Sequence, residues 1–210
     1  GGLDPDLAET YINQLITDLH ADLEDLGLSP SIHSIFIGGG TPSLLPVHSL
    51  DRLFKAISAV APIEADAEIT LEANPNSADQ SRLRGYRQVG VNRLSLGVQS
   101  FDDRSLLHLG RLHDGADAKR AIDAARAAGF SNLNIDLMFG LPYQTLPMAL
   151  ADLDQALDFS PEHLSWYQLT IEPNTVFFNR PPRQPSHDAL ADISSAGRAL
   201  LEQAGFERYE

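Results

Sequence analysis

Hydrophobic residues recur along this chain in two alternating patterns, one at helical spacing and one in short unbroken runs. Between residues 3 and 26 the apolar positions return every three or four residues, which predicts an amphipathic helix ended by Gly27. The apolar run at residues 32–37 predicts a buried strand. The same patterns continue downstream, predicting strands at 67–73, 93–98, 133–139 and 163–170 and helices at 50–60, 78–89, 116–128, 146–157 and 188–204.

This regular succession of strand and helix indicates the fold class. It is typical of parallel βαβ units with right-handed crossovers, and it predicts an α/β fold. No linker divides the chain, so we expect residues 1–210 to form a single domain. Ser49 is the predicted N-cap of the helix at 50–60. The proline-rich segment 173–187 is expected to be a loop, and residues 205–210 predict the start of a further strand.

Composition narrows the classes of partner. The formal net charge of −14 argues against non-specific nucleic-acid binding, which depends on lysine and arginine. No apolar run approaches the roughly 20 residues that a transmembrane helix needs, and no signal-like segment opens the chain, so we expect a cytoplasmic protein. The chain has no initiator methionine, and both of its ends have the character of cuts.

Cysteine is absent from the chain, which excludes disulfides and thiolate-bound zinc or iron within it. The seven histidines show no metal-binding spacing such as HxH or HExxH. We therefore assign no metal ligand and no catalytic residue to these 210 residues.

Three consecutive glycines, residues 38–40, follow the predicted strand at 32–37 and lead into Thr41. Glycine permits a tight bend and the close approach of a ligand to the backbone. The next strands also end in polar residues, namely Glu72, Gln99, Asp136, and Gln168 with Thr170. Because the carboxyl ends of parallel strands meet at one edge, these residues predict a ligand site there.

Other uses of the glycine run agree less well with the sequence. A Walker A loop needs a lysine directly after its last glycine, and the nearest lysine is Lys55. The dinucleotide motif GxGxxG needs a glycine where Ser43 stands. A hydrolase that uses Glu72 and Asp136 as paired carboxylates stays open, although it gives the glycines no role.

Six segments together resemble one family. They begin at Ile35 (IFIGGGTPS), Glu72 (EANP), Gly90 (GVNRLSLGVQSF), Leu109 (LGRLH), Asn134 (NIDLMFGLP) and Tyr167 (YQLTIEPNT). In this order and spacing they are similar to radical S-adenosylmethionine (SAM) enzymes, and within them to the group of oxygen-independent coproporphyrinogen III oxidases (HemN) and heme chaperones of the HemW type. The resemblance implies a partial (β/α)6 TIM-like barrel.

The resemblance also implies the residues that bind SAM: Gly39, Gly40, Thr41, Glu72, Gln99, Arg111 and Asp136. The glycine backbone and Glu72 would hold the amino group of the methionine moiety. Arg111 would pair with its carboxylate, which suits the fixed guanidinium fork. Gln99 and Asp136 would bind the ribose hydroxyls.

Two details resemble the heme chaperone branch more than the oxidases. His113 stands where the oxidases usually carry glutamine, and residues 170–175 are similar to the chaperone pattern. The resemblance then implies heme binding and delivery to a haemoprotein acceptor, with His113 a candidate heme ligand, in place of porphyrinogen decarboxylation. Tyr143 departs from the family, which commonly has glycine there.

The family's CxxxCxxC loop, whose thiolates hold a 4Fe-4S cluster, is expected to precede Leu3, together with the first barrel strand. The chain is therefore expected to be a truncated barrel domain and inactive by itself. Three hypotheses remain: a SAM-binding and 4Fe-4S protein that handles heme, a coproporphyrinogen oxidase, and a barrel without a cluster that binds another small molecule.

Overall fold

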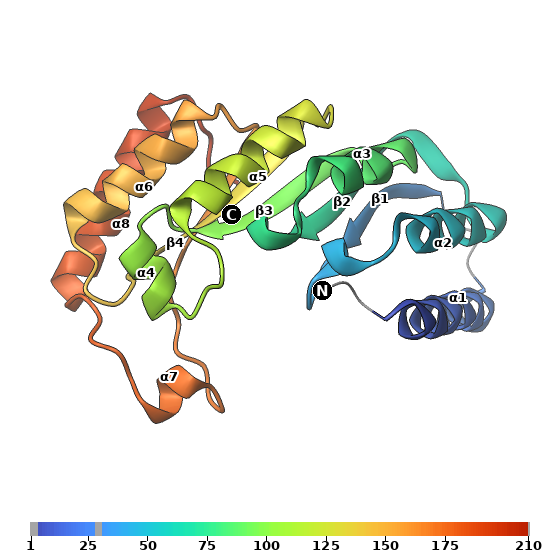
Figure 1. The fold of residues 1–210 in the computed structure, drawn as a ribbon, viewed down its shortest axis with the longest axis horizontal. Helices are drawn as coiled ribbons and strands as arrows, with labels where there is room; N and C mark the ends of the chain where they lie inside the picture. Colours follow the sequence, from blue (N-terminus) through green and yellow to red (C-terminus); the bar gives the residue numbers. More distant parts are fainter. Residues whose placement is uncertain (1–3, 28–30, 210) are drawn as a thin grey trace.

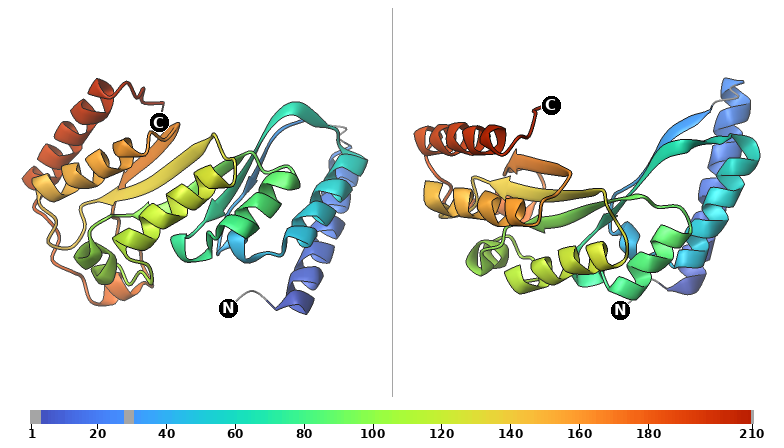
Figure 2. Two further views of the ribbon diagram at one scale, coloured as in Figure 1. Left: turned by 45° about the horizontal axis from the view of Figure 1, so that its top comes forward. Right: turned by 90° about the horizontal axis from the view of Figure 1, so that it is seen from above.

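The computed structural model describes residues 4–27 and 31–209 of the chain. Five parallel strands hydrogen-bond in chain order and curl into half of a barrel (Figure 1). Helices lie along the outside of the curl, while its concave side stays open (Figure 2). This confirms the predicted α/β fold and the partial TIM-like barrel.

The elements succeed one another as strand and helix in almost regular order. The strands are β1 (Ile32–Ile37), β2 (Ile63–Ala73), β3 (Arg93–Gln99), β4 (Leu133–Phe139) and β5 (His163–Gln168). The helices are α1 (Pro5–Leu26), α2 (Val47–Val60), α3 (Gln80–Gln88), α4 (Asp103–His108), α5 (Gly115–Ala127), α6 (Leu146–Asp158), α7 (Val176–Asn179) and α8 (His187–Gln203). Short 3₁₀ turns, η1 (Pro42–Leu44) and η2 (Pro75–Ser77), follow β1 and β2.

Several predicted boundaries are confirmed and one capping prediction is wrong. The bounds of β1 and β4 agree with the sequence pattern, and Gly27 ends α1 in the left-handed conformation with φ of 59°. Helix α2, however, begins three residues before the predicted start, with Pro46 preceding it. Ser49 is not its N-cap, because this residue is buried inside the helix and its hydroxyl donates to Oε1 of Glu9 over 3.0 Å.

Other differences arise where tertiary contacts override the local pattern. β2 begins at Ile63, four residues early, because extra residues of β2 between the pairs Ile32–Ile63 and Ser34–Glu68 shift the register and let Ile63 pair with Ile32. β5 ends at Gln168 and not at residue 170. Helix α4 was not predicted, and α7 lies inside the segment expected to be a loop. Residues 205–209 form no strand, although Tyr209 contacts the ring of His163 edge-on.

The two faces of the sheet differ sharply in polarity. Alternate residues of the central strands, including Leu71, Leu94, Leu96 and Ile135, are fully buried in the core beneath the helices. The residues between them face the concave side and are polar, among them Glu72, Ser95, Asn134, Asp136 and Ser165. The concave side of this half-barrel is thus suited to a polar ligand.

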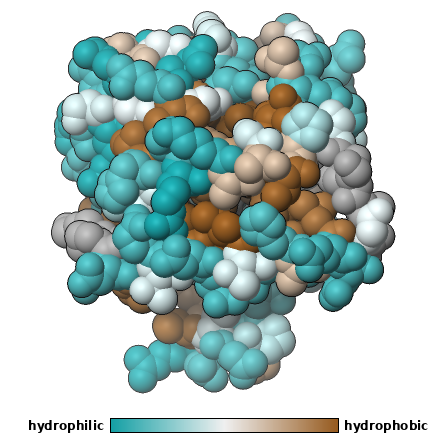
Figure 3. All heavy atoms as spheres, turned by 90° about the vertical axis from the view of Figure 1, so that its right-hand side faces the viewer, coloured by the Kyte–Doolittle hydropathy of each residue, from teal (hydrophilic) through white to brown (hydrophobic). Residues whose placement is uncertain are grey.

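The end of the molecule formed by β1, α1 and α2 shows hydrophobic surface between its polar residues (Figure 3). Among the large apolar side chains exposed on β1 and α1 are Leu7, Tyr11 and Phe36. Within residues 4–27 and 31–209, β1 pairs with β2 alone, so its other side is an edge of the sheet.

Helix α8 packs on β5 through one aromatic contact. The indole ring of Trp166 lies against Phe139, with 4.4 Å between the ring centroids, and against the backbone of Gly197 in α8. A Cβ atom at residue 197 would overlap the indole ring. Close packing of α8 on the sheet therefore needs glycine at this position.

We expect Gly197→Ala to lower the free energy of unfolding by about 3 kcal/mol, because the added methyl group forces the indole aside. Urea unfolding followed by fluorescence of Trp166, the only tryptophan, measures this. Ser195→Ala, at an exposed position of the same helix, is the control. Equal stability of the two variants would contradict the packing role of Gly197.

Candidate functional site

The predicted site residues meet at the carboxyl edge of the sheet around a hollow of about 260 Å³. Its lining is largely polar and comes from the loop after β1, from β2, β3, β4 and β5, and from the loops after β2 and β3: Gly40, Thr41, Pro42, Glu72, Ala73, Asn74, Ser95, Gly97, Gln99, Arg111, Asp136 and Tyr167. Gly39 touches this set through a hydrogen bond from its amide to Oε2 of Glu72, over 3.0 Å. All seven residues assigned from the sequence are therefore gathered at one place.

The glycine loop serves the site in two ways. Gly39 and Gly40 have φ of 81° and 57°, in the left-handed region that other residues disfavour. Gly38 is needed for space, because a Cβ there would lie 3.0 Å from the carboxyl carbon of Glu72. The loop thus bends tightly and leaves room for the carboxylate that its own amide binds.

Asn74 fastens the same loop from the β2 side. Its Nδ2 donates to Oγ1 of Thr41 over 3.4 Å, joining the segment after β2 to the segment after β1. Its Oδ1 then lies close to Gly97: a Cβ atom added to that glycine would be 3.2 Å from this oxygen. An amide oxygen is therefore presented beside the hollow.

Gln99 ends β3 in a strained conformation. Its φ is 70° although it is not glycine, and the pairing of β3 with β4 shifts register between Leu96 and Gln99. Such strain costs about 1–3 kcal/mol and persists only where surrounding contacts enforce it. The Gln99 side chain lies on the same face as Ser95 and Gly97 and lines the hollow, where Oε1 accepts a hydrogen bond of 2.8 Å from the hydroxyl of Tyr167.

Buried polar groups hold the chain on both sides of Gln99. From α6, Asp152 accepts hydrogen bonds of 2.7 Å from the Phe101 amide and from the Ser100 hydroxyl. Nε2 of His113 lies 3.0 Å from the carbonyl oxygen of Val98. Burial raises the pKa of Asp152 to about 6, against the opposing effect of these two donors.

Asp136 sits in a hydrogen-bonded row across the concave face. Its carboxylate accepts from Oγ of Ser95 over 3.0 Å and from Nδ2 of Asn134 over 2.7 Å. Ser165 donates in turn to Oδ1 of Asn134 over 3.2 Å. Burial raises the pKa of Asp136, opposed by its hydrogen bonds and aided by the charge of Glu72. The row fixes the carboxylate while leaving lone pairs that can face the hollow.

Arg111 supplies a cation to this wall. Its backbone is held by a hydrogen bond from its amide to the carbonyl of Leu106. Across the described ranges 4–27 and 31–209, no carboxylate lies within ion-pair distance of its guanidinium. The guanidinium is therefore available to an anionic ligand.

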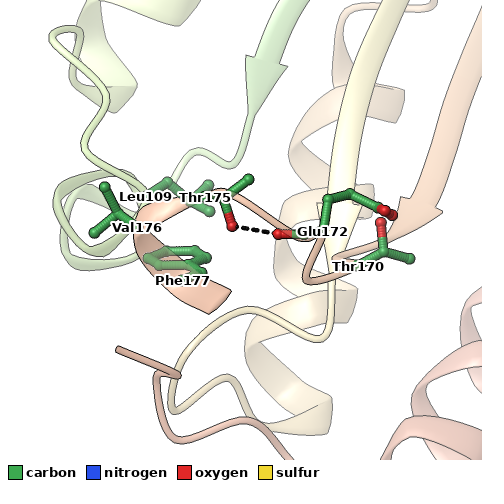
Figure 4. Close-up of a pocket in the computed structure, with 6 residues that line it drawn as sticks. All are labelled: Leu109, Thr170, Glu172, Thr175, Val176 and Phe177. Atoms are coloured by element: carbon green, nitrogen blue, oxygen red, sulfur yellow. Dashed lines mark hydrogen bonds between the residues drawn. The ribbon is translucent and has the colours of Figure 1, made fainter. Parts of the chain in front are cut away.

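Two of the predicted strand-end residues do not line this hollow. On β5 the inward position is Tyr167, which pairs with Met138, so Gln168 points to the opposite face. Thr170 lines a second hollow, of about 240 Å³, with Leu109, Glu172, Thr175, Val176 and Phe177 (Figure 4). Sequence reasoning missed Tyr167, Asn74, Ser95 and Gly97, although the alternation along β3 and β5 could have indicated Ser95 and Tyr167.

His113 is not placed to bind heme. It is 5% exposed, its Nε2 is bonded to the Val98 carbonyl, and burial lowers its pKa. The residue is structural. Tyr143, where the family commonly has glycine, has φ of 62°, so the backbone keeps a conformation that favours glycine.

Neither a metal cluster nor a membrane-spanning helix occurs among the described residues. Among them, no three His, Asp or Glu side chains come together to hold a metal ion. No helix in residues 4–27 and 31–209 is long and apolar enough to cross a bilayer.

The comparisons with known proteins identify the family. The model of the radical SAM superfamily matches residues 15–156, which is more than half of the chain. The chain belongs to the radical SAM superfamily. Among radical SAM structures it is similar to coproporphyrinogen III oxidase (HemN) from Escherichia coli, with a TM-score of 0.76 and 31% identity over 84% of this chain and 42% of that one.

Curated relatives lie nearer in sequence within the radical SAM superfamily. The chain is 50% identical to the heme chaperone HemW of Haemophilus influenzae, over 96% of this chain and 54% of the relative. It is 48% identical to HemW of Escherichia coli, over 96% of this chain and 53% of the relative. The chain spans about half the length of the curated relatives it matches.

Protonation of Asp152 should stabilise the fold. Because its folded pKa lies above the ordinary value, the ionised form is disfavoured, and stability from this group rises as pH falls from about 7 toward 4. Asp152→Asn mimics the protonated acid. As pH falls from about 7 to 4, we expect the free energy of unfolding of Asp152→Asn, relative to that of the wild type, to fall by about 2–3 kcal/mol.

Urea unfolding at several pH values measures this difference. Asp154→Asn, at an exposed position on the same helix α6, is the matched control. A difference between Asp152→Asn and the wild type that does not change with pH would contradict the burial argument.

Proposed function

We propose that the hollow at the carboxyl edge binds SAM. The observation that carries this is the meeting of complementary groups at one wall: an acceptor for an ammonium group in Glu72, a cation for a carboxylate in Arg111, and polar groups for hydroxyls in Gln99 and Asp136. A paired-carboxylate hydrolase would leave Arg111 and the glycine loop without a role.

Each group has a part in holding the ligand. Glu72, with the backbone of Gly39, Gly40 and Thr41, would bind the amino group of the methionine moiety. The planar fork of Arg111 would bind its carboxylate through two parallel hydrogen bonds. The hydroxyls of the ribose would lie against Gln99 and Asp136. When bound, SAM supplies the sulfonium group on which radical SAM chemistry depends.

A 4Fe-4S cluster does not fit the residues of this chain. Such clusters are held by cysteine thiolates, and the chain has none. In the full-length protein the cluster would be bound by other residues. The contribution of this chain is then to bind and orient SAM.

For the full-length protein we propose the function of a heme chaperone of the HemW type, which binds heme and delivers it to a haemoprotein acceptor in the cytoplasm. The support is the 50% and 48% identity to proteins of that name, against 31% to the oxidase HemN. Oxidation of coproporphyrinogen is the second candidate, supported by the backbone similarity to HemN. A barrel that binds another small molecule is the third.

One experiment separates these functions. The full-length protein, reconstituted without oxygen, is titrated with heme and separately assayed for coproporphyrinogen turnover. We expect stoichiometric heme binding without turnover. Turnover would instead establish the oxidase function, and the absence of heme binding, turnover and SAM binding together would leave only the third candidate.

Gly40→Val tests the SAM site itself. Valine at a φ of 57° is strained, and Gly40 lines the hollow, so the added side chain would take space beside a bound ligand. We expect the dissociation constant for SAM, measured by calorimetry on the full-length protein, to rise at least about tenfold, or about 1.4 kcal/mol.

Gly27→Val is the matched control for this change. Gly27 has φ of 59° and equally open space around a Cβ, but it ends α1 away from the hollow. Both variants carry similar backbone strain, so equal SAM affinity in the two would reject the assigned role of the glycine loop.

A further inference from the structure

Tyr167 is the one aromatic residue among those lining the hollow, and neither the sequence pattern nor the family resemblance assigns it a role. It lies on β5, two strands from Gln99 on β3, and its ring reaches over the end of β4 to make the hydrogen bond of 2.8 Å to Oε1. Burial, followed by the charge of Asp136, raises its pKa. The phenol therefore stays protonated at neutral pH and acts as a donor.

The hydrogen bond from Tyr167 and the nearby oxygen of Asn74 together favour one orientation of the Gln99 amide. With Oε1 turned to the phenol, Nε2 lies over Gly97, 3.0 Å from the place a Cβ would take. Oδ1 of Asn74 faces the same space, because its own Nδ2 is bonded to Thr41. The amide nitrogen is thus presented on the side of the hollow with an acceptor beside it, an arrangement that the reverse orientation of the amide would spoil.

Asp136 provides the opposite hydrogen-bonding character nearby. An ionised carboxylate only accepts, and its two donors, Ser95 and Asn134, hold it in place. The hollow therefore offers a donor in Gln99 Nε2 and an acceptor in Asp136. A pair of neighbouring hydroxyls, each able to donate and accept, satisfies both.

We propose that Tyr167 is a positioning residue that holds Gln99 as a hydrogen-bond donor, so that the site selects ligands carrying a vicinal diol. This inference rests on the proposed SAM function, whose ribose carries such a diol. Tyr167 acts through Gln99 and needs no contact with the ligand. The glycine at 97 leaves the space in which the Gln99 amide lies.

The test compares SAM with its 2′-deoxy and 3′-deoxy analogues, using dissociation constants measured on the reconstituted full-length protein. In the wild type, we expect loss of the hydroxyl that Gln99 binds to weaken binding about tenfold, because a buried donor is left unpaired. In Tyr167→Phe, SAM itself should bind about fivefold more weakly, and the penalty for that analogue should fall to about twofold.

Gln99→Glu supplies the second variant. Glutamate can still accept from Tyr167 but has no donor for the ligand, so we expect the same loss of discrimination without loss of shape. Because Tyr167 acts through Gln99, the double variant should bind SAM no more weakly than Gln99→Glu alone. Tyr11→Phe, at an exposed position on α1, is the matched control and should bind all three ligands as the wild type does.

The outcomes separate the two proposals. If Tyr167→Phe weakens SAM and both analogues equally, or additively with Gln99→Glu, Tyr167 has a structural role only and the inference is wrong. If Tyr167→Phe changes nothing while Gly40→Val abolishes SAM binding, the inference fails and the SAM site stands. If the reconstituted wild type does not bind SAM, the proposed function itself fails.

Discussion

The left-handed backbone at Gln99 is the constraint on which the site depends. By the alternation along β3, Gln99 lies on the same concave face as Ser95 and Gly97. The shifted register and the φ of 70° at the end of β3 set the backbone from which this side chain meets Tyr167. The strain is maintained by buried groups on both sides of Gln99. Asp152 of α6 binds Ser100 and Phe101, and His113 binds the carbonyl of Val98. Packing of the outer helix layer is thereby connected to the geometry of the concave face.

The polarity of the concave face follows from the half-barrel itself. Parallel strands covered by helices on one side can bury leucine and isoleucine there, while the other side must satisfy its polar groups among themselves or with a ligand. Here Ser95, Asn134, Asp136 and Ser165 bond to one another in a row. Such a preorganised row presents fixed acceptors at little cost when a ligand binds.

Membership of the radical SAM superfamily is compatible with the absence of cysteine. Cysteine thiolates hold the 4Fe-4S cluster, whereas the groups of this chain line a polar hollow. The described residues form a wall of glycine backbone, carboxylates, an amide and a guanidinium. Thiolates for a cluster must come from outside these 210 residues. The chain covers 54% and 53% of the two HemW relatives, and its five strands form half of a barrel.

The sequence by itself determined the fold class and about half of the residues that line the hollow. Strong periodicity set β1 and β4 at their observed bounds, and polar residues after apolar runs indicated Glu72, Gln99 and Asp136, since both signals are local. Arg111 was assigned only through the family resemblance. Local signals failed at Ser49, which pairs with Glu9 of another helix, and at the short helix α4. Only the tertiary structure decided that His113 is buried, that Tyr167 bonds to Gln99, and that Gln99 is strained. These properties depend on register and on contacts between residues distant in sequence, which no local pattern encodes.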